Sequence, residues 1–354
     1  MNINIISAWS SLAAFLLVSS TLSAAEQNAP PLRFDRDAGW HEAVISVADL
    51  DRSADFFRDV AGWTVLDRGR LDAGELAYLG LQDSTRDGRY AVIRPNDYPQ
   101  GWVRLVQYGA GDGPIIRANA QAWDTGGIFS IMTRSADATR NLRAAEAQGW
   151  LAYNEPYQFD FGDLSLLNLV MRGPDGVNIA VYEWLQPELP DAPAPGTISK
   201  AFNSMQMVRD TAAARDFYVN VLEFEVIAEG EFIDPEDRPT NFALPVNYAT
   251  RIPRAYTILI PAGADRAAGR VELMAFPGFT GRELGGRAAP GARGIQSLRF
   301  PVSHVALIVA RLKDHDAPIL FGPAPLPMPP FGTARAVTTQ SPDGAWLTFF
   351  ELPE

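Results

Sequence analysis

Carboxylates and arginines carry most of the chemistry that this 354-residue chain can offer, because it has no Cys and only three His. Without Cys there can be no disulfide, thiolate nucleophile, iron–sulfur cluster or Cys-based zinc site. With only His41, His304 and His315, a site built on two or three imidazoles is almost excluded by counting. Acidic side chains within strand-like segments, above all Glu272, are therefore the first candidates.

Glu272 is the leading candidate for a catalytic group. It lies in the stretch RVELM at residues 270–274, whose alternation places Arg270, Glu272 and Met274 on one face of a predicted strand. If this face lines a cavity, burial raises the pKa of the carboxyl, and Glu272 can act as a general base for proton abstraction next to a carbonyl. The competing interpretation is that Glu272 only pairs with a neighbour such as Arg270 or Arg299.

Two stretches with a shared pattern must position such groups. An alternating segment ends at Asp49 and another at Asp210, and in both an aromatic pair follows seven and eight residues later. An Asp at this place accepts hydrogen bonds from the first free amides of a helix, and the aromatic pair falls on the helix face that covers a sheet. Both stretches are therefore predicted to be a strand followed by a helix.

The same order occurs twice more, so the chain holds four units. Residues 127–149 and residues 294–313 each show a strand pattern and then a helix pattern. These two units close on a Pro-Asp-Gly turn, at residues 174–176 and 342–344, in which Pro sets φ and Gly accepts a positive φ before a last strand. Each unit is predicted to be a strand, a helix and about three strands.

A proline-rich stretch divides the chain into two halves of two units each. Residues 185–197 carry four prolines without hydrophobic periodicity, which is typical of a stiff linker. We expect a first domain over residues 32–187, a linker over residues 188–197 and a second domain over residues 198–354. Two domains also agree with the usual size of roughly 100 to 200 residues per domain.

The N-terminal segment predicts the cellular location of the chain, and the net charge argues against one class of partner. Residues 1–25 have no charged side chain, and the largely apolar residues 8–22 precede Ser23-Ala-Ala, as in a secretory signal peptide. The run is shorter than the ~20 residues of a spanning helix, so we expect a periplasmic or secreted protein without stable membrane insertion after cleavage. The net charge of -12 makes nucleic acid an improbable partner.

On these motifs the chain resembles the vicinal oxygen chelate superfamily, which includes glyoxalase I, bleomycin-resistance proteins and extradiol dioxygenases. The resemblance covers residues 38–354 and rests on the strand-Asp-aromatic pattern and the two Pro-Asp-Gly strands. It also rests on residues 217–224 (FYVNVLEF), which are similar to the family's aromatic pair and Leu-Gly-Phe turn. It implies an α+β fold of tandem βαβββ modules, with two paired-module cups, one in each half. Such a cup usually holds a divalent metal on its first and last strands.

The family's metal-binding places carry few metal ligands in this chain. Counting from the Asp residues, these places hold Glu42, Arg104, Ser130 and Ala180 in the first half and Asn203, Glu272, Ser297 and Thr348 in the second. Hydroxyl and amide donors alone hold zinc, nickel or iron poorly, and a fixed cation such as Arg104 repels a metal. We expect no cofactor and no metal, with Glu272, Asn203 and water as a weak candidate site for a hard divalent ion.

The cup of the second half is expected to bind a small molecule. Together with Glu272, the candidate binding residues there are Asn203, Met205, Ser297, Arg299, Trp346, Thr348 and Phe350. The Met and aromatic side chains suggest an apolar or aromatic ligand, although such a stripe is also typical of plain core. The distance from Asp210 places Asn203 and Met205 in the cup, whereas polarity would place Ser204 and Gln206 there.

In the first half, Glu42 and Arg104 occupy facing ligand places. They could form an ion pair that replaces the metal, or Arg104 could hold a substrate carboxylate. Two loops add alternatives: residues 278–294 carry three arginines and either close over an anionic ligand or form a solvated linker, and residues 230–254 form a surface loop that could cap the cup.

Three classes of function remain open. The leading one is an exported, glyoxalase-like protein that binds or transforms a small oxygenated, partly aromatic molecule by metal-independent proton transfer, as an isomerase or lyase does. The second is non-catalytic binding or sequestration, as in bleomycin-resistance proteins, and a weak-metal lyase or dioxygenase using Glu272 is a further alternative. The third is a paired scaffold that serves another enzyme. The oligomeric state, monomer or homodimer, is not fixed by the sequence.

Overall fold

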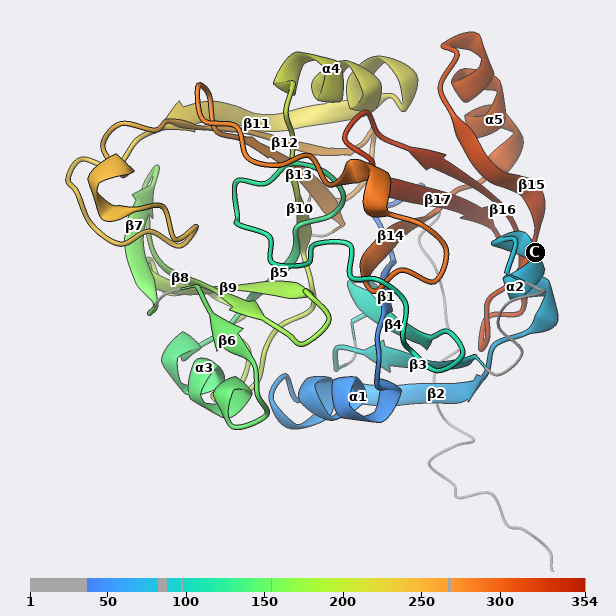
Figure 1. Ribbon diagram of the computed structural model, residues 1–354, viewed down its shortest axis with the longest axis horizontal. Helices are drawn as coiled ribbons and strands as arrows, with labels where there is room; N and C mark the ends of the chain where they lie inside the picture. The colour runs from blue at the N-terminus through green and yellow to red at the C-terminus, as the bar shows by residue number, and fades with distance from the viewer. Residues whose placement is uncertain (1–36, 82–87, 97, 154, 267–268, 354) are drawn as a thin grey trace, which may run out of the picture. The chain divides into compact units, whose positions relative to one another are not determined.

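Four units of one strand, one helix and further strands follow one another in the computed structural model, which describes residues 37–81, 88–96, 98–153, 155–266 and 269–353 (Figure 1). The predicted signal peptide, residues 1–25, lies outside the described residues. None of the described helices is long and apolar enough to cross a membrane. The predicted α+β fold of four successive modules is confirmed.

Modules 1 and 2 occupy the first half of the chain. Module 1 comprises β1 (Glu42–Ser46), α1 (Leu50–Asp59), β2 (Thr64–Arg70), α2 (Ala73–Tyr78), β3 (Arg89–Arg94) and β4 (Trp102–Gln107). Module 2 comprises β5 (Ser130–Arg134), α3 (Ala138–Glu146), β6 (Leu151–Ala152), β7 (Tyr157–Phe161), β8 (Leu164–Arg172) and β9 (Asn178–Gln186).

Modules 3 and 4 occupy the second half. Module 3 comprises β10 (Asn203–Met207), α4 (Thr211–Asp216) with a π-helical turn (Phe217–Val221), β11 (Phe224–Phe232), β12 (Arg254–Pro261) and β13 (Arg270–Ala275). Module 4 comprises β14 (Gly294–Pro301), α5 (Val305–Asp314), β15 (Ile319–Pro327), β16 (Thr333–Gln340) and β17 (Trp346–Glu351). Short 3-10 turns lie at Val246–Tyr248 and Gly285–Arg287.

The aspartates that end the first strands begin the helices, as the sequence predicts. Asp49 accepts a hydrogen bond from the backbone N–H of Arg52, and Asp210 accepts one from that of Ala213. Such a carboxylate satisfies a free N–H group and interacts favourably with the helix dipole. The Asp at the end of the first strand thereby sets the residue at which the following helix begins.

The strands form two large sheets, each built from two modules. Modules 1 and 4 form the outer-module sheet, in the order β15-β16-β17-β14-β1-β4-β3-β2. Modules 2 and 3 form the inner-module sheet, in the order β11-β12-β13-β10-β5-β9-β8-β6, with β7 paired to β8. In each sheet the two modules meet through their first strands, which run antiparallel: β1 beside β14 and β10 beside β5.

This pairing corrects one expectation from the sequence. The tandem order of modules was predicted, but each half was also expected to form its own cup, and that is wrong. Glu42 of the first half pairs with Arg299 of the second, and Ser130 pairs with Met205. The physical reason is that any first strand offers the same free edge to any other, so the pattern within one module does not select its partner.

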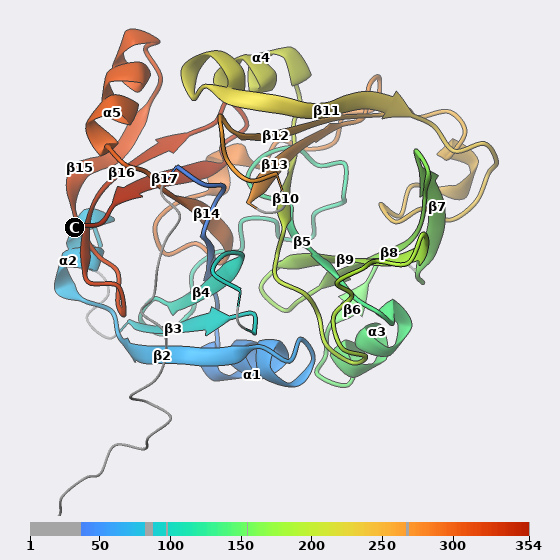
Figure 2. The same cartoon turned by 180° about the vertical axis from the view of Figure 1, so that it is seen from behind.

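The helices α1, α3, α4 and α5 each cover strands of their own module, and aromatic contacts join the two modules of each half, which belong to different sheets. The helix α1 packs on β2 to β4, α3 on β8 and β9, α4 on β13, and α5 on β15 to β17, as both views show (Figures 1 and 2). Between modules 1 and 2, the rings of Phe56 and Trp150 stack with centroids 3.7 Å apart. Between modules 3 and 4, Phe224 and Phe300 are in contact at 5.6 Å. Side-chain packing therefore joins the two modules within each half, while each sheet joins the two halves.

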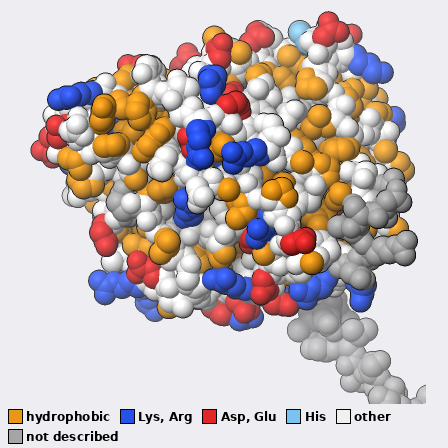
Figure 3. All heavy atoms as spheres, viewed as in Figure 1, with side chains coloured by type: hydrophobic (Ala, Val, Ile, Leu, Met, Phe, Trp, Pro, Cys, Tyr) orange, Lys and Arg blue, Asp and Glu red, His pale blue; other side chains and the backbone are white. Residues whose placement is uncertain are grey.

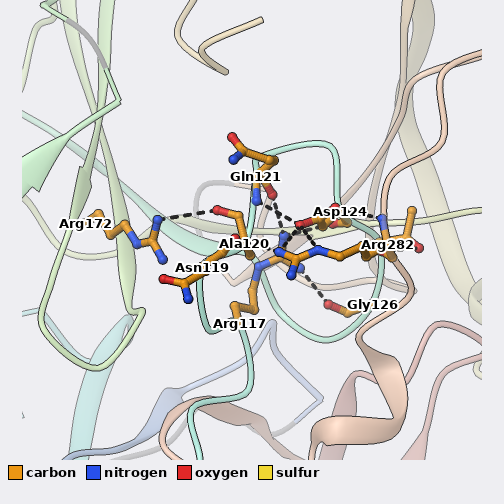
Figure 4. Close-up of polar contacts among 9 residues, drawn as sticks. Arg117, Asn119, Ala120, Gln121, Asp124, Gly126, Arg172 and Arg282 are labelled. Carbon is orange, nitrogen blue, oxygen red and sulfur yellow. Dashed lines mark hydrogen bonds and ion pairs between the residues drawn. The ribbon is translucent and has the colours of Figure 1, made fainter.

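Arginines fasten the two long connections between modules to each other. Figure 4 shows Arg282, from the connection after β13, in contact with Asp124 from the connection after β4, with an Nη2 to Oδ2 distance of 2.8 Å. In the same picture the buried Arg117 donates to the backbone oxygens of Asp124 and Gly126. Arg293 similarly pairs with Asp175 at 2.9 Å. The loop 278–294 is therefore an ordered junction, and two of its three arginines are engaged by aspartates, which argues against its closing over an anionic ligand.

Candidate functional site

The inner-module sheet encloses a cavity of about 160 Å³. Its walls are mostly aromatic or apolar and come from both modules: Met132, Tyr157, Phe159, Phe161, Leu164, Leu166, Tyr182, Trp184, Phe202, Met205, Phe232, Phe242, Tyr256, Ile258 and Met274. The polar lining consists of Arg134, Asn203, Asn241, Arg254, Arg270 and Glu272. A cavity of this size can hold a ligand of about one aromatic ring, since an engineered cavity of ~150 Å³ binds benzene.

The loop between β11 and β12 covers part of this cavity. Asn241 and Phe242 of the loop line it, and Asn241 donates a hydrogen bond to the Oδ1 of Asn168 in β8 at 2.6 Å. Figure 3 shows hydrophobic side chains gathered on the face over β7 and this loop, where Phe161, Ile233 and Val246 are exposed. Residues 230–254, expected as a surface loop that could cap a cup, thus contribute Asn241 and Phe242 to the lining of the inner-module cavity.

Glu272 projects from β13 into the cavity. Its neighbours Val271 and Leu273 point the other way, into the helix-side core, so the alternation of β13 orients the carboxyl inward. Glu272 lies deep in the protein and is still partly accessible, because its accessible surface faces the cavity. Burial raises the pKa of this carboxyl to about 7, although the hydrogen bond from Asn203 and the positive charge of Arg270 act in the opposite direction.

Asn203 fixes the orientation of the Glu272 carboxyl. Its Nδ2 donates to the Oε2 of Glu272 at 2.9 Å, and its own Oδ1 accepts from the backbone N–H of Ser204 at 2.9 Å. The amide therefore cannot turn without losing both bonds. One carboxylate oxygen of Glu272 is held by Asn203, and the other is available to a ligand.

Tyr182 places a neutral hydroxyl near Glu272. It lines the cavity from β9, and its hydroxyl has no hydrogen-bond partner among the described residues. Burial, and then the negative charge of Glu272, raise the pKa of Tyr182, so the hydroxyl keeps its proton at neutral pH. The cavity thus combines a carboxyl group that titrates near pH 7 with a hydrogen-bond donor.

The donor set of this cavity does not fit a divalent metal. Glu272 is the only carboxylate among the described lining residues, and the amide oxygen of Asn203 is already engaged by the backbone of Ser204. In module 2, which shares this sheet, the family's further ligand places hold Ser130, opposite Met205, and Ala180 in β9, so they offer one hydroxyl and no other donor. In residues 37–353, as far as they are described, no three His, Asp or Glu side chains are grouped as for a metal. Such a donor set holds zinc, iron or a hard divalent ion poorly.

In the outer-module sheet, a buried ion-pair network occupies the equivalent place. The Nε of Arg104 lies 2.8 Å from the Oε1 of Glu42, and both side chains are completely buried. Arg299 contributes a second contact to the same oxygen at 2.9 Å and reaches Glu75 of α2 at 3.3 Å. The predicted contact between Glu42 and Arg104 is therefore present. The two arginines lower the pKa of Glu42 to about 2 against the effect of burial.

Helix α2 fills the remaining space in the outer-module cup. Its Tyr78 hydroxyl lies 2.9 Å from the Oγ1 of Thr338, which in turn lies 2.9 Å from the Oγ1 of Thr348. The cavity left beside these residues is about 20 Å³. A water molecule needs ~10–15 Å³ measured this way, so the space that the described residues leave beside Tyr78 and Thr348 holds about one water.

The structure separates the binding residues that the sequence placed in one cup. Asn203 and Met205 lie with Glu272 in the inner-module cavity. Five others, expected beside them, lie instead in the outer-module sheet: Ser297, Arg299, Trp346, Thr348 and Phe350. This expectation is wrong because modules 3 and 4 do not share a sheet. Of these residues, Arg299 is held by Glu42 and Glu75, and Thr348 by Thr338.

The register of β10 agrees with the distance from Asp210. Asn203 and Met205 face the cavity, whereas the side chain of Gln206 exchanges hydrogen bonds with the Tyr218 hydroxyl on the helix side. Sequence analysis missed Arg134, Tyr182 and Arg254 as cavity residues. The first two could have been found by continuing the strand alternation past Ser130 and Ala180 to the next residues on the same face.

Comparisons with known proteins show which protein family and which solved structures this chain is similar to. A family model of the Glyoxalase/Bleomycin resistance protein/Dioxygenase superfamily matches residues 39–181 and 202–349. Glyoxalase I from Zea mays is similar in structure over 88% of this chain and 92% of that chain, with 17% sequence identity and a TM-score of 0.57. A proposed dioxygenase from Bacillus subtilis is similar over 91% of this chain and 87% of that chain, with 10% identity and a TM-score of 0.54. A search of curated proteins gave no match.

Proposed function

Because this chain belongs to the Glyoxalase/Bleomycin resistance protein/Dioxygenase superfamily, we propose that it binds a small oxygenated molecule with an aromatic or apolar body in the inner-module cavity. We propose further that Glu272 transfers a proton on this ligand without a metal, as an isomerase or lyase does. The observation that carries the proposal is a carboxyl group with a pKa of about 7 that faces an aromatic cavity. The protein would act after export, as residues 8–22 predict.

The proposed step is the formation of an enolate. The carboxylate of Glu272 takes a proton from the carbon next to the ligand's carbonyl, the C–H electron pair forms a C=C bond, and the carbonyl π pair moves to the oxygen. The Tyr182 hydroxyl donates a hydrogen bond to this oxygen. The protonated Glu272 then returns the proton to a carbon of the ligand. A pKa near 7 suits this role, because both protonation states of Glu272 are populated at neutral pH.

Hydrogen–deuterium exchange tests this step without knowledge of the natural product. Phenylpyruvate and phenylacetone, incubated with the protein in D2O, should lose the NMR signal of the protons next to their carbonyl groups faster than in buffer for at least one of the two. Glu272→Gln should reduce the rate to that of buffer, because an amide does not accept the proton. Tyr182→Phe should reduce it by roughly a hundredfold, as loss of an oxyanion donor does.

The control variant is Glu188→Gln, which alters an exposed carboxylate outside the cavity. It should exchange both compounds at the wild-type rate, and added EDTA should leave that rate unchanged. Exchange by the wild-type protein no faster than in buffer, or undiminished exchange by Glu272→Gln, would contradict the proton-transfer proposal.

A second candidate function is binding without turnover. It is favoured by one observation: Glu272 is the only carboxylate in the described cavity lining, so no second acidic group is at hand to relay the proton. In that case phenylpyruvate or phenylacetone would bind, with chemical-shift changes for the ligand, while deuterium exchange stayed at the buffer rate. The same NMR samples therefore distinguish the two candidates.

A further inference from the structure

Two arginines line the inner-module cavity without an ion pair to any described acidic residue. The guanidinium of Arg134, at the end of β5, has no hydrogen bond to a described residue and lies 4.1 Å from the ring centre of Phe202. Arg270, at the start of β13, lies 6.0 Å from the same ring and donates its Nε to the backbone oxygen of Arg266. The two cations therefore approach the ring of Phe202 from β5 and β13, the strands on either side of β10, and Glu272 lies on the same strand as Arg270.

The cavity carries an excess of positive charge at this place. Three arginines line it against one carboxylate, Glu272, which is largely uncharged below its pKa of about 7. At another place Arg254 is neutralised by Asp234, with an Nη1 to Oδ2 distance of 2.6 Å. Arg134 and Arg270 have no such partner in the part of the chain that the structure describes, although Asp265 acts on Arg270 electrostatically. The excess is therefore concentrated around Phe202.

These two cations are in an unfavourable environment. Burial, and then the charge of Arg270, lower the pKa of Arg134 to about 10. Burial likewise lowers the pKa of Arg270, and the pKa of Lys200 is lowered by burial and by Arg134. An anion bound between Arg134 and Arg270 would relieve both the desolvation and the repulsion.

The shape of the Arg134 guanidinium favours a planar anion as its ligand. In Arg134 the Nε is inaccessible, whereas neither terminal nitrogen is among the buried atoms that lack a partner. The two terminal nitrogens form a fork of parallel N–H bonds, which matches the two oxygens of a carboxylate. Stacking on Phe202 holds the plane of this fork in place.

We propose that Arg134 and Arg270 bind the carboxylate of a small aromatic or apolar acid, whose body occupies the aromatic part of the cavity beside Glu272. This inference rests on the proposed function, because it assigns a substrate class to the same cavity. It goes beyond it by making a negative charge a requirement for recognition. Ligands of this class are acids in which a carbonyl and a carboxylate are borne on one ring-sized body.

The test compares acids with their uncharged amides. Phenylacetate, 3-phenylpropionate, indole-3-acetate and hexanoate, each beside the corresponding amide, are titrated against the full-length protein and followed by NMR chemical shifts. At least one acid should bind about tenfold more tightly than its amide. Arg134→Gln and Arg270→Gln should each weaken that acid about tenfold and leave the amide unchanged. Phenyl phosphate serves as the probe for a tetrahedral anion.

The matched control is Arg172→Gln. Arg172 is also partly buried and lies over an aromatic ring, Tyr153 at 6.0 Å, but it is not part of the cavity lining. It should leave acid binding unchanged, and amide binding together with the thermal unfolding of each variant reports whether the fold is intact.

Three results would overturn the proposal: no preference for the acid in any of the four pairs, an equal loss in Arg172→Gln, or tighter binding of phenyl phosphate than of every acid. Because binding needs no proton transfer, Glu272→Gln should retain the preference for the acid. Failure of the deuterium-exchange experiment with success here would reject the enolate step alone. The reverse outcome would reject the carboxylate subsite alone.

Discussion

At the scale of single residues, two buried glutamates, Glu42 in the first strand of module 1 and Glu272 in the last strand of module 3, have pKa shifts of opposite sign. Glu42 contacts two arginines, and its pKa is lowered to about 2. Glu272 has Asn203 and a more distant Arg270, and its pKa is raised to about 7. Paired cations thus make Glu42 a permanent charge of the fold, whereas Glu272 keeps a proton that it can exchange. The sign of the pKa shift depends here on the number of neighbouring guanidinium groups.

These shifts have opposite consequences for the pH dependence of stability. For Glu42 the folded-state pKa is below the usual 4.5, so its stabilisation is present above pH 4.5 and is lost as the pH falls towards 2. For Glu272 the folded-state pKa is above 4.5, so the folded protein loses stability as the pH rises from 4.5 to about 7. The loss due to Glu272 is on the order of 3 kcal/mol above pH 7.

Glu272→Gln should therefore stabilise the protein at alkaline pH only. At pH 8 the variant should be more stable than the wild type by up to about 3 kcal/mol, because Gln accepts the hydrogen bond of Asn203 without carrying a buried charge. At pH 5 the two proteins should differ little. The measurement is urea unfolding at both pH values, with Glu188→Gln as a surface control. A variant that is less stable than the wild type at pH 8 would show that the Glu272 charge is compensated in the folded state.

At the scale of elements, the short helix α2 decides which cup can accept a ligand. It lies between β2 and β3 of module 1 and packs on β15 of module 4. Its Glu75 contacts Arg299, and its Tyr78 contacts Thr338, so both a charged and an aromatic side chain anchor it in the outer-module cup. In module 3, β11 and β12 are joined instead by the loop that caps the inner-module cavity, and the space beneath it stays open.

Truncation of Tyr78 should reveal how much of the outer-module sheet depends on this helix. Tyr78→Ala should cost roughly 3–5 kcal/mol of unfolding free energy, because it removes a buried ring and leaves a cavity. Tyr78→Phe should cost about 1 kcal/mol, since Thr338 keeps its contact with Thr348. Urea unfolding at pH 7 measures both values. Equal small losses would mean that α2 only covers the sheet and does not fill it.

The strands and helices could be predicted from the sequence, but which modules pair in a sheet could not. The Asp residues at the helix starts gave the strand registers, so Asn203 and Glu272 were correctly assigned to one cavity. The residues Ser297 and Thr348 were not, because their place depends on which first strands meet. The first strands β1, β5, β10 and β14 are all buried, and the ion pair between Glu42 of β1 and Arg299 of β14 joins residues 257 positions apart, so no pattern within one module points to it. Tyr182 and Arg134 were missed because they lie outside the positions that usually carry metal ligands in this family.

At the scale of the whole molecule, each half of the chain completes both sheets of the other. The edges of β1 and β5 in the first half are covered by β14 and β10 of the second. A half on its own would keep the packing between its two modules, including the contact between Phe56 and Trp150, but it would expose two unpaired strand edges. Exposed edges of this kind bind further strands.

Residues 32–187 and residues 198–354, produced separately, should therefore not remain as folded monomers. Each should self-associate or aggregate, and a mixture of the two refolded together should give a complex with the size and the cooperative unfolding of the intact chain. Size-exclusion chromatography and circular dichroism of the two halves, alone and mixed, measure this. A stable monomer of residues 32–187 would show that a half satisfies its own strand edges.

Because modules 2 and 3 share one sheet and modules 1 and 4 the other, the two sheets can form at different times during synthesis. The partners in the inner-module sheet, such as Ser130 and Met205, are close along the chain, whereas Glu42 and Arg299 are separated by 257 residues. Chains emerge from the N-terminus, and pairings between distant segments form later than pairings between near ones. All strands that line the inner-module cavity have therefore been made once β13 has emerged. At that stage β1 still lacks its partner strand β14 of module 4. A ligand present at that stage would stabilise an unfinished chain, so its supply could affect how much protein matures as well as how much is occupied.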